Sequence, residues 1–323
     1  MTRILLITNK QDFTTDFVVK RLKEARADFY RLNTEEIGKS CFITLDFSKG
    51  QFWLYDILLN QKYDIRSFSS VYFRRPELPE IETGDLSQEE QLFVKAEHHQ
   101  FLEGLYKLLR KAYWISPLDA IKRAENKLYQ IDLAQEIGLT IPPSIITNEV
   151  TAFKCFSQEE DCIVKPILTG QIGWPEMHKV VFTSKLEHNP SDGEIQSCPS
   201  YLQKRIEKEC DIRLTIVGKS TFAVAIDSQH HIDTQTDWRK GENLLPHRII
   251  EMPQHLKDKC YRMLSELELQ YGAFDFILDK SGNYFFLEVN PNGQWAWIEC
   301  QVGCDISGAI AQQLIRGEYE KYI

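Results

Sequence analysis

Residues 273–293 constrain the fold of this chain more than any other segment. Two runs rich in aromatic and aliphatic residues, 273–278 and 283–289, flank a short polar stretch at 279–282. Aspartate, serine and glycine in that stretch favour a tight turn, and the flanking runs alternate apolar with polar residues. The segment therefore predicts an antiparallel β-hairpin.

The pairing of this hairpin brings three oxygen-bearing side chains together. A four-residue turn puts Asp275 opposite Phe286 and diagonal to Glu288, and Asn290 has the same parity as Glu288. Side chains related in this way share one face, and their oxygens suit Mg²⁺ that holds phosphates. We expect a metal site of Asp275, Glu288 and Asn290. The same alternation would also suit the solvated face of an ordinary hairpin.

The first third of the chain alternates strands with helices, which is typical of an open α/β layer. Its expected strands are residues 3–8, 41–47, 51–55 and 70–73, and its expected helices are 13–23 and 85–113. The residues after the second helix, 114–117, contain serine and proline and break it. We place the first domain boundary at 114–118.

The middle of the chain predicts a different architecture. A helix over 119–137 ends at Gly138, and the strands that follow are separated by turn residues, as in an antiparallel meander. These strands are expected at 144–147, 162–165, 179–183, 200–203, 212–217 and 220–226. Further helices are expected at 254–270 and at about 305–320.

Composition narrows the classes of partner. The net charge of −9 disfavours non-specific nucleic-acid binding, which draws on surplus Lys and Arg, so a polyanion such as ATP must meet a local cluster of cations. No apolar run is long enough for a membrane span, and the eight cysteines lack the spacing of a zinc site or a disulfide framework. We expect free thiols, a cytoplasmic location, and no membrane or nucleic-acid partner.

The hairpin motif resembles a known family. Asp275, in Phe-Asp-Phe, is followed thirteen residues later by Glu288-Val289-Asn290-Pro291-Asn292-Gly293, which is similar to the metal-binding signature of the ATP-grasp superfamily. The resemblance implies an α/β (α+β) ATP-grasp fold in three parts. These are an N-terminal pre-ATP-grasp α/β domain at 1–116, a central lid domain at 117–203, and a C-terminal domain with the metal site at 204–323.

The same resemblance implies where ATP binds. Lys127, at the head of a helix, and Lys165, at the end of a strand, match the family's two nucleotide-binding lysines. The loop 169–173 would offer backbone N–H groups to the phosphates through Gly170 and Gly173, although two glycines are fewer than the family usually has. The adenine-binding residues would be Gln203, Lys204, Arg205, Ile206 and Glu207, in a segment that could otherwise be a plain edge strand.

Two arginines and one acid complete the implied active site. Arg213 and Arg239 match family arginines that lie beside the transferring phosphate. A planar guanidinium fits a phosphoryl group better than an ammonium does. Asp211 is a candidate base for the second step because it is close to Arg213 in the sequence.

A narrower resemblance covers nearly the whole chain. Residues 72–76, which include Arg74 and Arg75, the sequence Asp237-Trp238-Arg239 and the Trp-rich segment 290–299 together resemble the microviridin-type peptide macrocyclases, or graspetide synthetases. The resemblance implies that ATP activates an Asp or Glu side chain of a ribosomal precursor peptide as an acyl phosphate. A hydroxyl or amine of the same peptide then forms an ester or amide crosslink.

This resemblance also implies the partners. ATP would bind with two Mg²⁺ ions, Arg74 and Arg75 would contact the substrate, and the protein would form a homodimer. Residues 176–200 could bind the leader part of the precursor by strand addition, or could be a surface hairpin without that role.

Three other functions are alternatives to peptide macrocyclization. A ligase of the same fold that adds a free amino acid to a small molecule or protein tail is the nearest alternative. A regulatory module that binds nucleotide without turnover fits poorly with so many candidate charged residues. A dinucleotide-binding oxidoreductase is excluded, because residues 8–13 contain no glycine after the first strand.

Overall fold

The computed structural model describes residues 3–79, 84, 86–168, 171–172, 179–180, 183–186, 189–231, 234–240, 245–320 and 322. Within these ranges the helices are α1 (Phe13–Glu24), α2 (Gln88–Leu108), α3 (Leu118–Ala124), α4 (Lys127–Ile137), α5 (Val150–Glu159), α6 (Asp192–Ser197), α7 (Gln254–Glu266), α8 (Ala296–Val302) and α9 (Ile306–Arg316). The strands are β1 (Arg3–Thr8), β2 (Asp28–Asn33), β3 (Cys41–Asp46), β4 (Gln51–Asp56), β5 (Gln61–Asp64), β6 (Ser70–Phe73), β7 (Tyr113–Ile115), β8 (Ser144–Thr147), β9 (Cys162–Lys165), β10 (Gln171–Ile172), β11 (Lys179–Val180), β12 (Ser184–Lys185), β13 (Ser200–Lys204), β14 (Lys208–Val217), β15 (Ser220–Ile226), β16 (His247–Ile249), β17 (Tyr271–Asp279) and β18 (Tyr284–Asn290).

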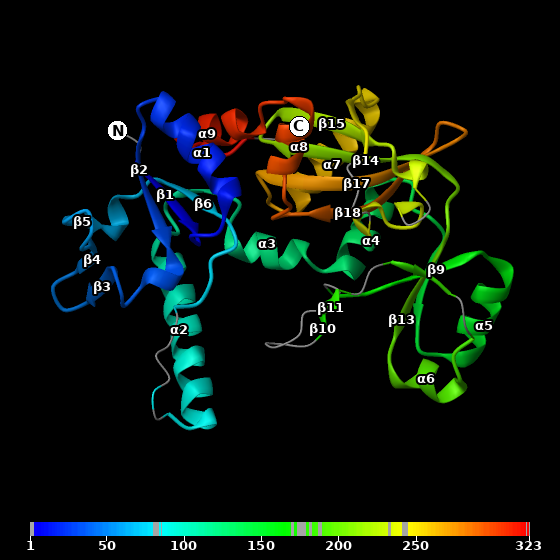
Figure 1. Cartoon of the computed structure of the whole chain (residues 1–323), viewed down its shortest axis with the longest axis horizontal. Helices are drawn as coiled ribbons and strands as arrows, with labels where there is room; N and C mark the ends of the chain where they lie inside the picture. The colour runs from blue at the N-terminus through cyan, green and yellow to red at the C-terminus, as the bar shows by residue number, and fades with distance from the viewer. Residues whose placement is uncertain are drawn as a thin grey trace.

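The N-terminal part is an α/β layer, as predicted. Its parallel sheet has the order β2-β1-β6-β7, and β3, β4 and β5 form a separate antiparallel meander beside it (Figure 1). Strand β7 occupies part of the segment predicted to be only a break between domains. Three buried residues are enough for this strand because it pairs with β6 at the sheet edge.

The end of the chain returns to this first sheet. Helix α9 lies beside α1 in Figure 1, and Ile306, Ile310 and Leu314 share a buried cluster with Ile4 and Leu22. The α1 residue Arg21 also forms an ion pair of 2.8 Å with Asp305. The predicted C-terminal unit therefore packs partly on the N-terminal domain.

The C-terminal sheet carries the hairpin predicted from sequence. Its order is β16-β15-β14-β17-β18, with antiparallel pairing throughout. Helices α3, α4 and α7 share one hydrophobic core with this sheet, so residues 118–137 pack with the C-terminal domain and not with the lid. The predicted helix over 119–137 is two helices, because the Asn126 side chain caps α4 by accepting a hydrogen bond from the Tyr129 backbone N–H.

The lid is a small sheet of order β12-β9-β13-β8, covered by α5 and α6 (Figure 1). Strand β13 lies between β9 and β8, so the alternative of a plain edge strand for this segment is wrong. Helices α5 and α6 were not predicted. Helix α6 lies between the strands predicted at 179–183 and 200–203, and at its start Ser191 and Glu194 form a reciprocal capping box.

Two general predictions concern the whole chain. All eight cysteines are free thiols, as expected. Among the residues that the structure describes, no helix is long and apolar enough to cross a membrane.

Gln130 joins helix α4 to strand β18. Its side-chain oxygen accepts a hydrogen bond from the Val289 backbone N–H (2.8 Å), and its amide nitrogen donates to the Val289 carbonyl (2.8 Å) and the Ala124 carbonyl (2.5 Å). Gln130 is only 3% exposed. Strand β18 is at the edge of its sheet, and the Gln130 amide forms the two backbone hydrogen bonds that a further strand would offer Val289. Val289 directly follows Glu288.

We predict that Gln130→Ala lowers the free energy of unfolding by about 2–4 kcal/mol, because it leaves buried backbone groups of Val289 without partners. Gln135→Ala, at an exposed position of the same helix, should change it by less than about 0.5 kcal/mol. Urea unfolding of both variants measures the difference. Equal stability of the two variants would contradict the role given to Gln130.

Candidate functional site

A β-bulge in the hairpin sets the position of the predicted metal ligands. Strands β17 and β18 pair Phe276 with Phe286, but the register then shifts and Asp275 pairs with Glu288. The predicted pairing of Asp275 with Phe286 is therefore wrong. Leu287 is the extra residue, and it lets Phe286 stay in the core while Glu288 lies opposite Asp275.

The corrected register still brings the predicted ligands to one face. Asp275 and Glu288 are directly opposite, and Asn290 follows Glu288 by two residues on the same strand. The Asn290 side-chain oxygen accepts a hydrogen bond from the Asn292 backbone N–H (3.1 Å), which orients the amide and leaves a second lone pair. A Cβ at Gly293 would lie 2.8 Å from that of Ala273, so glycine is required for this loop to fold back on β17.

Asp275 is a buried carboxylate held by an arginine. Arg213, on the adjacent strand β14, donates a hydrogen bond of 2.8 Å to Asp275, and the two side chains are 8% and 18% exposed. Burial raises the pKa of Asp275 to about 6, which the Arg213 charge opposes and the Glu288 charge reinforces. Arg213 and Asp275, predicted separately as a phosphate-binding arginine and a metal ligand, are thus in contact.

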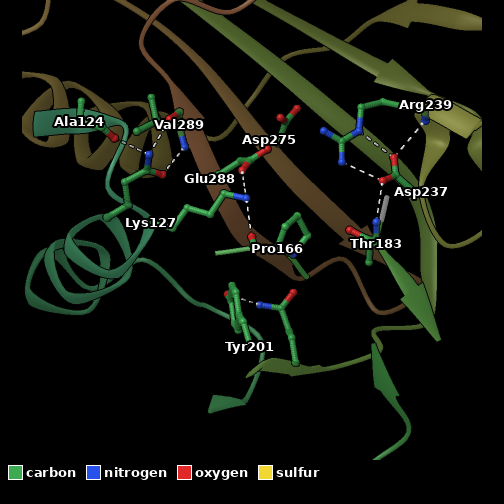
Figure 2. A network of polar contacts seen from close by, with 12 residues as sticks. Ala124, Lys127, Pro166, Thr183, Tyr201, Asp237, Arg239, Asp275, Glu288 and Val289 are labelled. Carbon is green, nitrogen blue, oxygen red and sulfur yellow. Dashed lines mark hydrogen bonds and ion pairs between the residues drawn. The ribbon is translucent and has the colours of Figure 1, made fainter. Parts of the chain in front are cut away.

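Lys127 connects three parts of the molecule at this face. Its ammonium donates to the Pro166 carbonyl (2.9 Å) and lies 3.7 Å from the Glu288 carboxylate, as Figure 2 shows. Because Lys127 is the first residue of α4, the Asn126 cap fixes its place. The contact joins the helix, the segment after β9 and the hairpin.

Lys165 is the second predicted nucleotide lysine, at the end of β9. Its strand position faces Tyr201, and its ammonium lies 6.0 Å from the centre of the Tyr201 ring. Burial lowers the pKa of Lys165 to about 8, against the opposite effect of the Glu288 charge. A half-buried ammonium with a lowered pKa is suited to a polyanionic ligand.

Arg239 is held by Asp237, an acid that has no role in the function predicted from the sequence. Its Nε and Nη2 atoms donate to the two oxygens of Asp237 at 2.8 and 2.7 Å. Asp237 also accepts a hydrogen bond from the Thr183 backbone N–H (3.3 Å), which ties the lid to this loop (Figure 2). The Asp237-Trp238-Arg239 motif contained the signal, because an acid two residues before an arginine can orient it.

Asp211 forms a buried ion pair with Lys208, at 2.6 Å. Burial raises the pKa of Asp211, and Lys208 acts against this shift. The candidate base therefore has one carboxylate oxygen already bonded to an ammonium.

The predicted adenine segment has its side chains engaged elsewhere. Lys204 and Arg205 form ion pairs with Glu160 (2.8 Å) and Asp161 (2.6 Å). Gln203 is buried and donates to Ser144 and Tyr201, at 3.0 Å each, and exposed Glu207 lies 3.5 Å from Lys280. Among the described residues, the backbone N–H groups of Ile206 and Glu207 form no hydrogen bond. These two N–H groups are therefore free to donate to a ligand.

The remaining predicted residues divide into two groups. Arg74 is buried at the end of β6, where it meets Asn292, and Arg75 is exposed beside it. Gly170 and Gly173 lie outside the described residues, as does part of the predicted leader-binding region 176–200.

The donor set at the hairpin fits a hard divalent cation. Asp275, Glu288 and Asn290 offer only oxygen atoms, and burial of Asp275 beside a second carboxylate creates negative charge that Mg²⁺ would offset. The described residues contain no cluster of three or more His, Cys, Asp or Glu that could hold a metal. The oxygen donors on this face are therefore two carboxylates and the Asn290 amide.

Comparisons with known proteins identify the family of the fold. Residues 3–122 match the family model of the MvdD pre-ATP-grasp domain. The macrocyclase MdnB from Microcystis aeruginosa MRC is 31% identical and superposes with a TM-score of 0.80, over 98% of this chain and 100% of that one. No curated protein matches the sequence significantly.

Two other solved structures are similar over their full length. One is an RiPP-associated ATP-grasp ligase from Chryseobacterium gregarium in complex with ADP and a leader and core peptide, with 26% identity, a TM-score of 0.88 and complete coverage of both chains. The other is the M. aeruginosa macrocyclase MdnC bound to its precursor peptide MdnA, with 25% identity, a TM-score of 0.84 and coverage of 98% and 100%. This chain belongs to the family of ATP-grasp ligases that includes these macrocyclases.

We predict that the affinity for ADP without Mg²⁺ falls several-fold between about pH 7 and about pH 9.5. Phosphate favours the charged form of Lys165, so binding above its free pKa of about 8 requires proton uptake. Lys165→Met should bind ADP more weakly and without this decline, whereas Lys154→Met, at an exposed position, should keep the wild-type profile. Isothermal titration calorimetry measures both, and an unchanged profile in Lys165→Met would exclude Lys165 as the titrating group.

Proposed function

We propose that this enzyme activates a carboxylate side chain of a ribosomal precursor peptide and joins it to a hydroxyl or amine of the same peptide. In the first step the carboxylate attacks the γ-phosphate of ATP, which gives an acyl phosphate and ADP. In the second step the hydroxyl or amine displaces inorganic phosphate and loses its proton. Each ester or amide crosslink thus removes one water from the peptide.

The observation that carries the proposal is the arrangement of charges around the hairpin. Asp275 and Glu288 face each other, Arg213 and Lys127 contact them, and the half-buried Lys165 feels the charge of Glu288. These residues come from α4, β9, β14 and the hairpin, so the fold gathers cations around two carboxylates. Phosphoryl transfer depends mainly on such positioning and charge compensation.

Each of these residues has a specific part in the proposal. Asp275, Glu288 and Asn290 hold Mg²⁺, which when bound neutralises phosphate charge; we propose two ions. Lys127 and Lys165 bind the α- and β-phosphates as point charges. Gly170 and Gly173 cover the phosphates, while Gln203 and the segment 204–207 contact adenine, chiefly through the backbone.

The two arginines act on the transferring group. Arg213 exchanges part of its contact with Asp275 for the γ-phosphoryl oxygens, and Arg239, oriented by Asp237, stabilises the acyl phosphate. Asp211 accepts the proton in the second step only after its ion pair with Lys208 has broken. Arg74 and Arg75 contact the peptide, and residues 176–200 bind its leader.

The full-length similarity to macrocyclases and a precursor-bound ligase supports a peptide substrate over a free amino acid. The test is to incubate the enzyme with ATP, Mg²⁺ and a candidate precursor, a short peptide rich in Thr, Ser, Glu and Asp. The proposal predicts ADP release together with peptide that has lost one water per crosslink. ADP release with free amino acids, and unchanged peptide mass, would favour the amino-acid ligase instead.

The proposal also includes that the enzyme forms homodimers and acts in the cytoplasm.

We predict that Arg213→Ala lowers turnover by about 1,000-fold or more, the range for removing an arginine that stabilises phosphoryl-transfer charge. ADP affinity should change little, because Lys127 and Lys165 remain. Arg262→Ala, at an exposed position of α7, is the matched control and should turn over as wild type does. Wild-type turnover in Arg213→Ala would remove Arg213 from the mechanism.

A further inference from the structure

Arg74 is a buried cation at the seam between the N-terminal domain and the C-terminal sheet. The side chain is 1% exposed. Its Nη1 atom donates to the Asn292 carbonyl (2.7 Å) and to the Asn292 side-chain oxygen (3.2 Å). The end of β6 is thereby attached to the loop that follows the metal-binding hairpin.

The other edge of the same guanidinium has no partner in the described part of the chain. Nε and Nη2 are both buried and form no hydrogen bond with any described residue. These two nitrogens are the parallel pair that grips a carboxylate through two bonds. Arg239 shows the filled version in this chain, because its Nε and Nη2 hold both oxygens of Asp237.

The charge of Arg74 also has no counter-ion among the residues that the structure describes. In the described part of the chain, no acidic side chain forms an ion pair with Arg74 or with Arg75. Asp12, an acid that acts electrostatically on Arg75, already accepts hydrogen bonds from Thr8, Thr14 and Thr15. A buried cation without an anion is costly, and two adjacent arginines add to that cost.

The unpaired edge is close to the reaction centre. Asn292, the partner of Nη1, donates its backbone N–H to the proposed ligand Asn290. Two residues span at most about 7 Å of chain, so the Asn292 contact of Arg74 is anchored close to the hairpin site. Tyr271 contacts the same loop, because its hydroxyl donates to the Gly293 carbonyl (2.8 Å).

We propose that the Nε and Nη2 edge of Arg74 binds a carboxylate of the substrate other than the one that reacts. This inference rests on the proposed function and specifies its substrate as an acid with a second carboxylate nearby. Protein atoms cover the edge, so the carboxylate enters when the two domains separate at the Arg74–Asn292 seam. Exposed Arg75 is the cation that it meets first.

Binding of capped dipeptides, without ATP or Mg²⁺, tests the proposal. Acetyl-Glu-Glu-amide carries only side-chain carboxylates, acetyl-Gln-Gln carries only a terminal one, and acetyl-Gln-Gln-amide carries none. Calorimetry compares wild type with Arg74→Met, which removes the charge, and Arg74→Lys, which keeps the charge and a donor for Asn292 but lacks the two-nitrogen edge. Arg262→Gln is the matched surface control.

We expect Arg74→Met and Arg74→Lys to bind at least one carboxylate probe about 10-fold more weakly than wild type does, and the uncharged probe equally. Sensitivity to the Glu-Glu probe identifies a side-chain acid, and sensitivity to acetyl-Gln-Gln identifies a terminal carboxylate. Equal affinities in all proteins would overturn the proposal, and Arg74→Lys keeps the test valid if Arg74→Met does not fold. Loss of peptide ligation with this binding intact would instead count against the proposed function.

Discussion

The register shift between Asp275 and Phe276 is the constraint on which the active site depends. Without it, strict alternation would put Glu288 on the same side as Phe286, which is buried among Phe274, Phe276 and Val289. The extra residue in β18 lets the aromatic core and the acidic face coexist on one short strand. Gln130 then holds Val289 from the opposite side, so the acidic face has a rigid support.

The site on this face places positive side chains around two carboxylates, with little solvent between them. Two carboxylates meet cations from a helix, a lid strand and a neighbouring sheet strand, and each element brings one charge to the centre. Several of these charges are poorly hydrated, which raises the pKa of Asp275 and lowers that of Lys165. Such groups favour a ligand that carries both phosphate and metal, because it compensates both signs of charge.

Sequence reasoning reached the fold class, and it put the three candidate ligands on one face because that arrangement survives a one-residue bulge in the hairpin. It could not find the bulge, since three consecutive apolar residues, Phe285 to Leu287, give no sign of which one is extra. Gln130 and Asp237 were missed for a related reason. Their importance lies in contacts with Val289 and Arg239 that only the folded chain creates.

The most direct test of the account is a crystal structure with ADP and Mn²⁺, read by the anomalous signal of the metal. The account predicts a peak bonded to oxygens of Asp275, Glu288 and Asn290, with the bulge at Leu287 retained. A peak bound only by phosphate oxygens, with Asp275 still paired to Arg213 alone, would contradict it. So would a structure in which Glu288 points into the aromatic core.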